Sequence, residues 1–300
     1  MLGSDHQWSP RIGAVYYIPR SQTAIRASFN RLFMLPQVEN VLLSSSAQAR
    51  RLSPFVASIG SGGAPVHAER VSAYEIGISQ AVRTAFRLDL NLWNRNVQNF
   101  DDPNVLFSTA IVFPNSVASG FARGLEVRID VPSHHGWSAY LSYSNSRIQE
   151  TGPINGGLFL TDEVIDIGSG THFVPDHDQR NVGDLGITYM FPRRPLWTTF
   201  SARYESGVPI EVDPDQLDSL KQMPGAHLLN FARGRVAPRF IAGISMGMDV
   251  LERKHVGVKA QFDLENIANA AFVYNFGNPF SGTHFGNPRL FAGRLHFNFK

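Results

Sequence analysis

The sequence predicts an all-β protein, an antiparallel portion of a transmembrane β-barrel with about eleven strands. Three observations predict this class. Apolar and polar residues alternate over many short stretches, the connections between the stretches are alternately short and long, and no run of apolar residues is long enough for a transmembrane helix. Charged residues make up only 17% of the chain, below the roughly 25% that is typical of soluble domains.

The alternation is clearest in four stretches. In residues 86–92 the even positions are apolar and the odd positions are polar or charged. The same period of two runs through residues 121–131, 256–265 and 291–299, with Arg123 as the exception on the apolar face of its stretch. Because successive side chains of a strand point to opposite faces, each stretch is expected to be a ribbon with one apolar and one polar face.

Stretches of this kind are expected as strands along the whole chain. In order they cover residues 11–18, 23–31, 70–79, 84–94, 121–131, 137–147, 181–191, 196–205, 240–251, 256–265 and 288–299. No stretch of comparable length has the helical period of about 3.6 residues.

The connections between these strands fall into two classes that alternate without a break. The short class, expected as periplasmic turns, covers residues 19–22, 80–83, 132–136, 192–195 and 252–255. The long class, expected as extracellular loops, covers residues 32–69, 95–120, 148–180, 206–239 and 266–287. This asymmetry is typical of an outer-membrane barrel, whereas a soluble sandwich has no reason to place every long connection at one end.

The strand count itself indicates an incomplete barrel. Complete bacterial barrels have an even number of strands and begin from the periplasm. This chain is expected to have an odd number, with the first and last strands both running toward the periplasm. We therefore expect the C-terminal part of a larger barrel, open and curved, with two unpaired edges.

Composition excludes several other classes. The formal net charge is only +2, which leaves no basic surplus for nucleic acid, and the chain has no cysteine for disulfides or cysteine-based metal sites. The first residues lack the basic start and apolar run of a secretory signal. No cofactor, metal site or catalytic constellation is expected, and the protein is not expected to be an enzyme.

The C-terminal part of the sequence carries recognisable motifs. Phe262-Asp263-Leu264-Glu265-Asn266 leads into an Asn-rich connection, then Pro288-Arg289 and a final alternating strand that ends in aromatic residues. Asp176-His177-Asp178-Gln179-Arg180 precedes another strand, and Ser9-Pro10-Arg11 opens the first. In this order the motifs resemble those of TonB-dependent outer-membrane receptors, and the resemblance covers nearly the whole chain.

The resemblance implies a role in transport across the bacterial outer membrane. Such receptors are plugged barrels of about 22 strands, so residues 1–300 would be the C-terminal half of the barrel, without the plug domain and the N-terminal strands. The intact relative would import a large, scarce ligand, such as a metal chelate, an oligosaccharide or a peptide. Its partners would be outer-membrane lipid, the TonB system through the missing plug segment, and the barrel-assembly machinery, which would recognise the terminal aromatic residues Phe297 and Phe299.

Two other interpretations remain open. A self-contained smaller barrel, acting as a passive pore or translocator, would need one more strand, from residues 38–43 or 228–236. A soluble all-β binding module or carbohydrate-active enzyme is disfavoured by the alternation of short and long connections.

Charged residues on the polar faces are the first group of candidate ligand contacts. Charge on the lipid face costs roughly 2–4 kcal/mol at mid-membrane, so these side chains are expected to line the lumen. The group consists of Arg87, Asp89, Glu126, Arg128, Lys259, Asp263 and Glu265.

Loop residues form the second group of candidates: Asp176, His177, Asp178 and His284. Adjacent residues of an extended chain point in opposite directions, so the first three are expected to form a polar junction with Arg180 near carboxylates rather than a metal site. Aromatic residues are expected in part as interfacial girdles. They are Trp8, Tyr16, Tyr17, Trp93, Trp137, Tyr140, Trp197 and Tyr204.

Overall fold

The computed structural model describes most of the chain. The described residues are 6–36, 38, 48, 66–105, 112–155, 168–210, 217–253, 256–278 and 282–299. No helix among them is long and apolar enough to cross a membrane.

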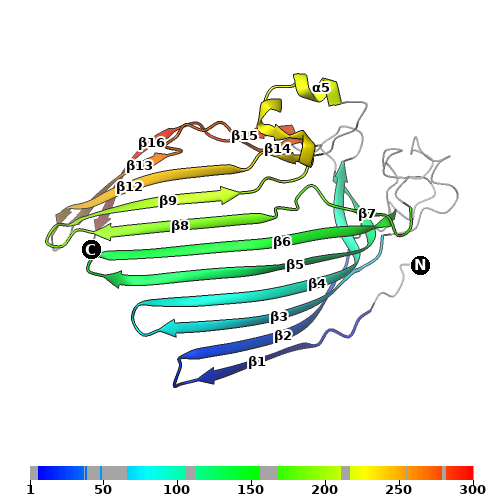
Figure 1. The fold of residues 1–300 in the computed structure, drawn as a ribbon, viewed down its shortest axis with the longest axis horizontal. Helices are drawn as coiled ribbons and strands as arrows, with labels where there is room; N and C mark the ends of the chain where they lie inside the picture. The colour runs from blue at the N-terminus through cyan, green and yellow to red at the C-terminus, as the bar shows by residue number, and fades with distance from the viewer. Residues whose placement is uncertain are drawn as a thin grey trace.

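One antiparallel sheet dominates the structure, and its strands follow each other in chain order (Figure 1). The expected eleven wall strands are all present. They are β1 (Arg11–Ile18), β2 (Thr23–Met34), β3 (Glu69–Val82), β4 (Phe86–Val105), β5 (Val112–His134), β6 (Trp137–Asn155), β8 (Asn181–Met190), β9 (Leu196–Glu205), β12 (Arg239–Glu252), β13 (Val256–Glu265) and β16 (Leu290–Phe299). The two-residue strand β7 (His172–Phe173) pairs with β6 beside this series.

The strands β4, β5 and β6 are longer than the sequence pattern indicated. Residues 95–105, 112–120 and 148–155 were expected in loops, but they continue the strands. The β4–β5 pairing resumes at Phe100 and Val117 after a break at Asn99, whose φ is 53°. A strand segment that projects beyond the lipid needs no apolar face. The alternation of apolar and polar residues is therefore weak in these extensions.

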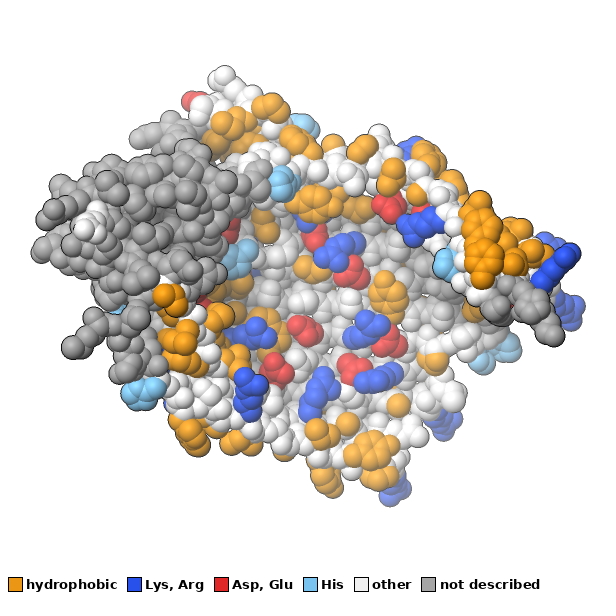
Figure 2. All heavy atoms as spheres, turned by 180° about the vertical axis from the view of Figure 1, so that it is seen from behind, with side chains coloured by type: hydrophobic (Ala, Val, Ile, Leu, Met, Phe, Trp, Pro, Cys, Tyr) orange, Lys and Arg blue, Asp and Glu red, His pale blue; other side chains and the backbone are white. Residues whose placement is uncertain are grey.

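The cross-strand register gives the sheet two chemically distinct faces. Asp89 lies opposite Arg128 and Leu90 lies opposite Val127, so polar residues meet on one face and apolar residues on the other. Figure 2 looks into the hollow of the curved sheet and shows Lys, Arg, Asp and Glu side chains spread across its floor. We call this the concave face and the other, which carries Leu90, the convex face.

The sheet is open. β1 and β16 stand at the two ends of the strand order, and each pairs with a single neighbour among the described strands. The expectation of a curved wall with two unpaired edges is therefore confirmed.

Two long connections fold together into a small domain-like cap at the long-loop end of the wall. It contains α5 (Leu217–Gln222), η3 (Ala226–Leu228), β10 (Leu229–Asn230), η4 (Phe231–Arg233), β11 (Arg235–Val236), β14 (Val273–Asn278) and β15 (Gly282–Phe285). Ile210 and Val236 from the first connection pack against Val273 and Phe276 from the second. We call this unit the loop cap.

The loop cap also decides one open question about strand number. Residues 229–230 and 235–236 pair with each other in a separate two-stranded sheet, so residues 228–236 add no strand to the wall. The other possible source of a strand, residues 38–43, lies outside the described residues except for Val38.

Three large aromatic side chains rest on glycines of the neighbouring strand, on the concave face. A Cβ at Gly124, Gly186 or Gly247 would overlap the ring of Trp93, Tyr140 or Trp197 respectively. These aromatic residues were expected partly as interfacial girdles, but the register turns them inward, next to polar neighbours. Trp137, by contrast, lies on the convex face, with its ring centroid 4.5 Å from that of Tyr189.

We predict that Gly186→Ala destabilises the wall because the Tyr140 ring occupies the space of the new methyl group. Overpacking of this kind costs about 1–3 kcal/mol. The measurement is the urea midpoint of the folded, heat-modifiable band on gels. Gly183→Ala in the same strand is the matched control, because its Cβ would lie 3.8 Å from the nearest atom, Ser142 O. Equal midpoints for the two variants would contradict the prediction.

Candidate functional site

The concave face is the candidate site, and the sequence-predicted polar residues of the strands all lie on it. The register places Arg87 opposite Asp130, Glu126 opposite Asn91, and Asp263 opposite Ser245. The full set on this face is Arg87, Asp89, Glu126, Arg128, Lys259, Asp263 and Glu265. They do not form one cluster, because the first four lie on β4 and β5 and the others on β13.

The first charged cluster joins β2, β3 and β4. Arg87 Nε lies 2.8 Å from Asp89 Oδ2, and Arg26 Nη1 lies 3.7 Å from Asp89 Oδ1. Ser79 donates a hydrogen bond to Asp89 and accepts one of 2.6 Å from Arg26. The Asp89 carboxylate thus has three partners from three strands, which fixes its position on the wall.

The second charged cluster lies on β5. Arg128 contacts Asp130, with 2.7 Å between Arg128 Nη2 and Asp130 Oδ1 and 2.9 Å between Arg128 Nε and Asp130 Oδ2. The guanidinium carbon lies 5.5 Å from the ring centroid of Tyr140 on β6. Both charged side chains remain substantially exposed, so the pair shapes the surface rather than adding much stability.

The third charged cluster joins β8, β9 and β12. Arg203 contacts Asp184 at 2.9 Å and Glu205 at 2.8 Å, and Glu205 also pairs with Arg239. Glu205 is buried, so its two arginine partners compensate for its lost hydration.

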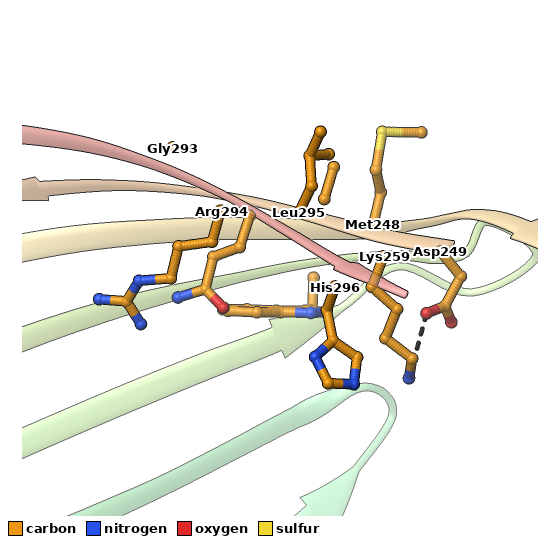
Figure 3. Close-up of a pocket in the computed structure, with 10 residues that line it drawn as sticks. Met248, Asp249, Lys259, Gly293, Arg294, Leu295 and His296 are labelled. Atoms are coloured by element: carbon orange, nitrogen blue, oxygen red, sulfur yellow. Dashed lines mark ion pairs between the residues drawn. The ribbon is translucent and has the colours of Figure 1, made fainter. Parts of the chain in front are cut away.

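The fourth charged cluster lines a hollow at the β16 side of the wall. The cavity has a volume of about 690 Å³, and its polar lining includes Asp249, Lys259, Gln261, Arg294 and His296. Figure 3 shows these charged side chains on one side of the strands and Met248 and Leu295 on the other. Lys259 Nζ lies 3.2 Å from Asp249 Oδ1, which the dashed line marks.

Asp263, deeper on the same wall, is held by three groups. Its Oδ1 accepts hydrogen bonds of 2.6 Å from Ser245 and 2.7 Å from Gln261, and its Oδ2 lies 3.4 Å from Arg294 Nη2. Glu126 and Glu265 differ from it, because neither has an ion pair within the part of the chain that the structure describes. These two carboxylates are therefore the candidates with charge available to a ligand.

Sequence reasoning missed several partners in these clusters. They are Arg26, Asp130, Asp184, Arg203, Asp249 and Arg294. The signal that could have identified them is parity, because each occupies the polar face of its own strand, although only Asp130 shares a strand with a residue already on the candidate list.

The loop candidates occupy different environments. Asp176 and His177 are exposed, with 3.1 Å between Asp176 Oδ1 and His177 Nδ1, whereas Asp178 is fully buried. His284 is exposed on β15, and its backbone N–H donates to Asn275 Oδ1. No group of three or more metal-ligating side chains occurs among the described residues.

Asp178 ties three segments of the chain together. Its Oδ2 lies 2.5 Å from both Arg180 Nε and Arg235 Nη2, and its Oδ1 accepts a 2.7 Å hydrogen bond from Ile148 N. Arg235 also donates to the carbonyl oxygens of Asp178 and Gly207. Asp178 therefore links β6 to the loop cap and is a structural residue, as the proximity of Arg180 to carboxylates indicated.

A pair of partly buried acids lies at the long-loop end of β3 and β4, beyond the length needed to span a membrane. Asp101 N donates a 3.0 Å hydrogen bond to Glu69 Oε2. Burial raises the pKa of both the Glu69 and the Asp101 carboxyl above their ordinary values. Burial therefore disfavours negative charge at both positions.

The terminal aromatic residues lie on the convex face of β16. Phe297 and Phe299 are 55% and 80% exposed, and they alternate with His296 and Asn298 on the concave face.

Comparison with known proteins gives one family and a set of similar folds. The profile of the family described as TonB dependent receptor-like, beta-barrel, matches residues 3–246. No curated protein matches the sequence. Solved structures that resemble the chain share its fold at low identity. The receptor FpvA from Pseudomonas aeruginosa PAO1 bound to pyoverdine has a TM-score of 0.61 at 15% identity, over 97% of this chain and 36% of that one.

Two further solved structures are also similar to this chain in fold. The unliganded ferric citrate transporter FecA has a TM-score of 0.63 at 16% identity, over 97% of this chain and 38% of that one. The ferric-catecholate import receptor Fiu from E. coli K12 has a TM-score of 0.60 at 15% identity, over 96% of this chain and 34% of that one. The chain thus spans between a third and two fifths of the length of these structures.

We predict that the two faces differ in chemical accessibility within a membrane. The chain has no cysteine, so each variant carries a single thiol. Asn91→Cys and Ser142→Cys should react with a membrane-impermeant maleimide, because both side chains face the concave, hydrated side. Leu90→Cys and Leu141→Cys, on the adjacent positions of the same strands, are the matched controls and should stay unlabelled, as mass spectrometry would show. Equal labelling of all four would contradict the assignment of the faces.

We predict that Asp178→Asn loosens the loop cap. The change leaves the guanidiniums of Arg180 and Arg235 without their anionic partner, and breaking a buried ion pair costs about 3 kcal/mol or more. Limited proteolysis of the folded barrel should then cut residues 174–180 and 206–238 faster. Asp176→Asn, at an exposed carboxylate, should leave the cleavage rate unchanged. An unchanged rate in Asp178→Asn would show that the ion pairs do not hold the cap.

Proposed function

The chain belongs to the TonB-dependent receptor-like β-barrel family, and on that premise we propose that it forms the ligand-facing wall of a receptor that imports a large, scarce ligand. The family consists of transporters and receptors rather than enzymes, and its members are outer-membrane proteins of Gram-negative bacteria. The chain is thus an outer-membrane protein. Short turns face the periplasm and the loop cap faces the outside in this assignment.

The observation that carries the proposal is the difference in polarity between the concave and the convex face of the sheet. The concave face holds rows of ion-paired and hydrogen-bonding side chains, such as Arg128–Asp130 and Arg203–Asp184, whereas the convex face is mainly apolar. A wall with this arrangement separates lipid from a hydrated interior. Most cations on the concave face are already neutralised, so the wall offers hydrogen bonds to a polar ligand without a strong field of one sign.

The open edges support a larger barrel. β1 and β16 each lack one neighbour among the described strands, and unpaired backbone groups in lipid cost several kcal/mol each. We propose that residues 1–300 supply the C-terminal strands of a barrel that further strands close. The gate and the segment that contacts TonB would belong to that complete receptor.

Ligand contact would come from two parts of this chain. Glu126 and Glu265 present carboxylates on the wall, and Asp176, His177 and His284 are exposed at the outer end. The named solved structures are a receptor bound to pyoverdine, a ferric citrate transporter and a ferric-catecholate import receptor. For this receptor the proposed ligand classes are a metal chelate, an oligosaccharide and a peptide.

The proposal predicts uptake that depends on TonB. Cells that carry the complete receptor should accumulate at least one of three radiolabelled probes: ferric citrate, maltohexaose or pentaglycine. The accumulation should disappear in an otherwise identical strain without TonB, because import requires inner-membrane energy. Cells with the empty vector control for background entry.

The competing assignment, a passive pore, predicts the opposite pattern. Liposomes that contain the protein would then swell in arabinose, and probe entry would be the same with and without TonB. That combination would refute the proposed transport role.

A further inference from the structure

The short turns of the wall contain basic residues and no acidic residue. Four of them, which join β1 to β2, β3 to β4, β8 to β9 and β12 to β13, contain exposed arginines. These arginines are Arg20, Arg83, Arg193, Arg194 and Arg253. The remaining turn, between β5 and β6, contains the exposed residue His135. We call the five arginines the basic rim.

Acidic residues of the connections all lie at the opposite end of the wall. Asp176, Asp178 and Asp218, for example, belong to the long connections. Glu252, the last residue of β12, is the one acidic residue that adjoins a short turn. Within the described residues, none of the five arginines of the basic rim is in an ion pair. The short-turn end of the wall is therefore strongly positive.

The backbone of the turns does not explain why these residues are basic. The φ angle is 51° at Arg83, 69° at Arg193 and 50° at His135. Such left-handed positions of tight turns favour Gly, Asn or Asp, because a bulkier side chain is sterically disfavoured there. A smaller residue would suit the backbone better at all three positions, so the basic side chains point to a role outside the turns themselves.

The basic rim is an extended row and not a pocket. The short turns follow each other along one rim of the sheet (Figure 1). Successive turns are two strands apart, so they are separated by about 10 Å and the five turns extend over about 40 Å. A small anion cannot contact two turns at this separation. The row is suited to a partner that presents many negative charges over a similar length.

Aromatic residues mark the level of the lipid headgroups next to this rim. Trp137, the first residue of β6, and Tyr189 on β8 lie on the convex face with 4.5 Å between their ring centroids. Aromatic side chains of this kind lie at the boundary between hydrocarbon and water. Arg193 and Arg194 come after the end of β8, so they lie beyond the headgroups, on the periplasmic side.

We propose that the basic rim binds peptidoglycan, the anionic polymer layer beneath the outer membrane. The peptide stems of this polymer carry free carboxylates that repeat along each glycan strand, and guanidinium groups form charge-assisted hydrogen bonds with carboxylates. A single exposed ion pair is weak, but several turns that contact one polymer would bind it multivalently. The inference rests on the membrane orientation given above and not on transport.

The test measures co-sedimentation of the folded protein, in an uncharged detergent, with purified peptidoglycan sacculi. Arg83→Gly/Arg193→Gly should weaken binding at least tenfold, since each basic residue near an anionic surface contributes a factor of about five. Glycine readily adopts the positive φ of both positions, so the fold should be retained. Arg233→Gln/Arg289→Gln removes the same charge from exposed positions at the opposite end of the wall and should leave the apparent Kd within twofold.

Additional arms separate charge from folding and polymer from lipid. Arg83→Lys/Arg193→Lys should retain most of the binding, and the heat-modifiable band reports whether each variant is folded. Sacculi whose carboxylates have been amidated should bind at least tenfold more weakly. Equal binding by the Gly variant, equal binding of the amidated sacculi, or displacement of the sacculi by phosphatidylglycerol micelles would overturn the proposal. Failure of TonB-dependent uptake would refute the transport role and leave this binding unaffected.

Discussion

Backbone pairing between neighbouring strands is the constraint on which the rest of this structure depends. Hydrocarbon offers no partner to an N–H or C=O group, so each wall strand must satisfy its backbone on both sides. The resulting register fixes which residues share a face. Once Asp89 is opposite Arg128, Leu90 and Val127 must meet on the other side, and a shift by one residue would expose charge to lipid along the entire strand.

Sequence alone predicted the parts of the fold that this constraint governs. Residues 196–205 and 256–265 were expected as strands with the observed bounds. There one face meets lipid and the other meets water, so apolar and polar residues alternate clearly. The prediction from sequence failed for the parts of the strands that extend beyond the membrane. Near Phe100 and Ile148 the strands continue, although both faces meet water or protein and the alternation fades. The sequence could not predict the loop cap either, because contacts such as that of Val236 with Val273 join segments far apart in the chain.

The same distinction holds for the candidate site. Period two was enough to assign Asp263 and Arg128 to the concave face, because parity is local information. It could not identify Ser245 and Arg294 as partners of Asp263, since cross-strand pairs depend on the register of three strands. It also could not tell which of the eight aromatic residues form the expected girdles. The rings of Trp93 and Trp197 instead fill the space above glycines on the concave face.

The succession of strands in chain order has a consequence for how the wall assembles. Most pairings join elements adjacent in sequence, so each new hairpin can add to the edge left by the previous one at a small cost in loop entropy. Low contact order of this kind favours rapid, stepwise growth. The two outermost strands, β1 and β16, cannot be completed in this way. In the larger barrel proposed above, sealing them would join strands that are far apart in the sequence, and non-local pairings of this kind form slowly.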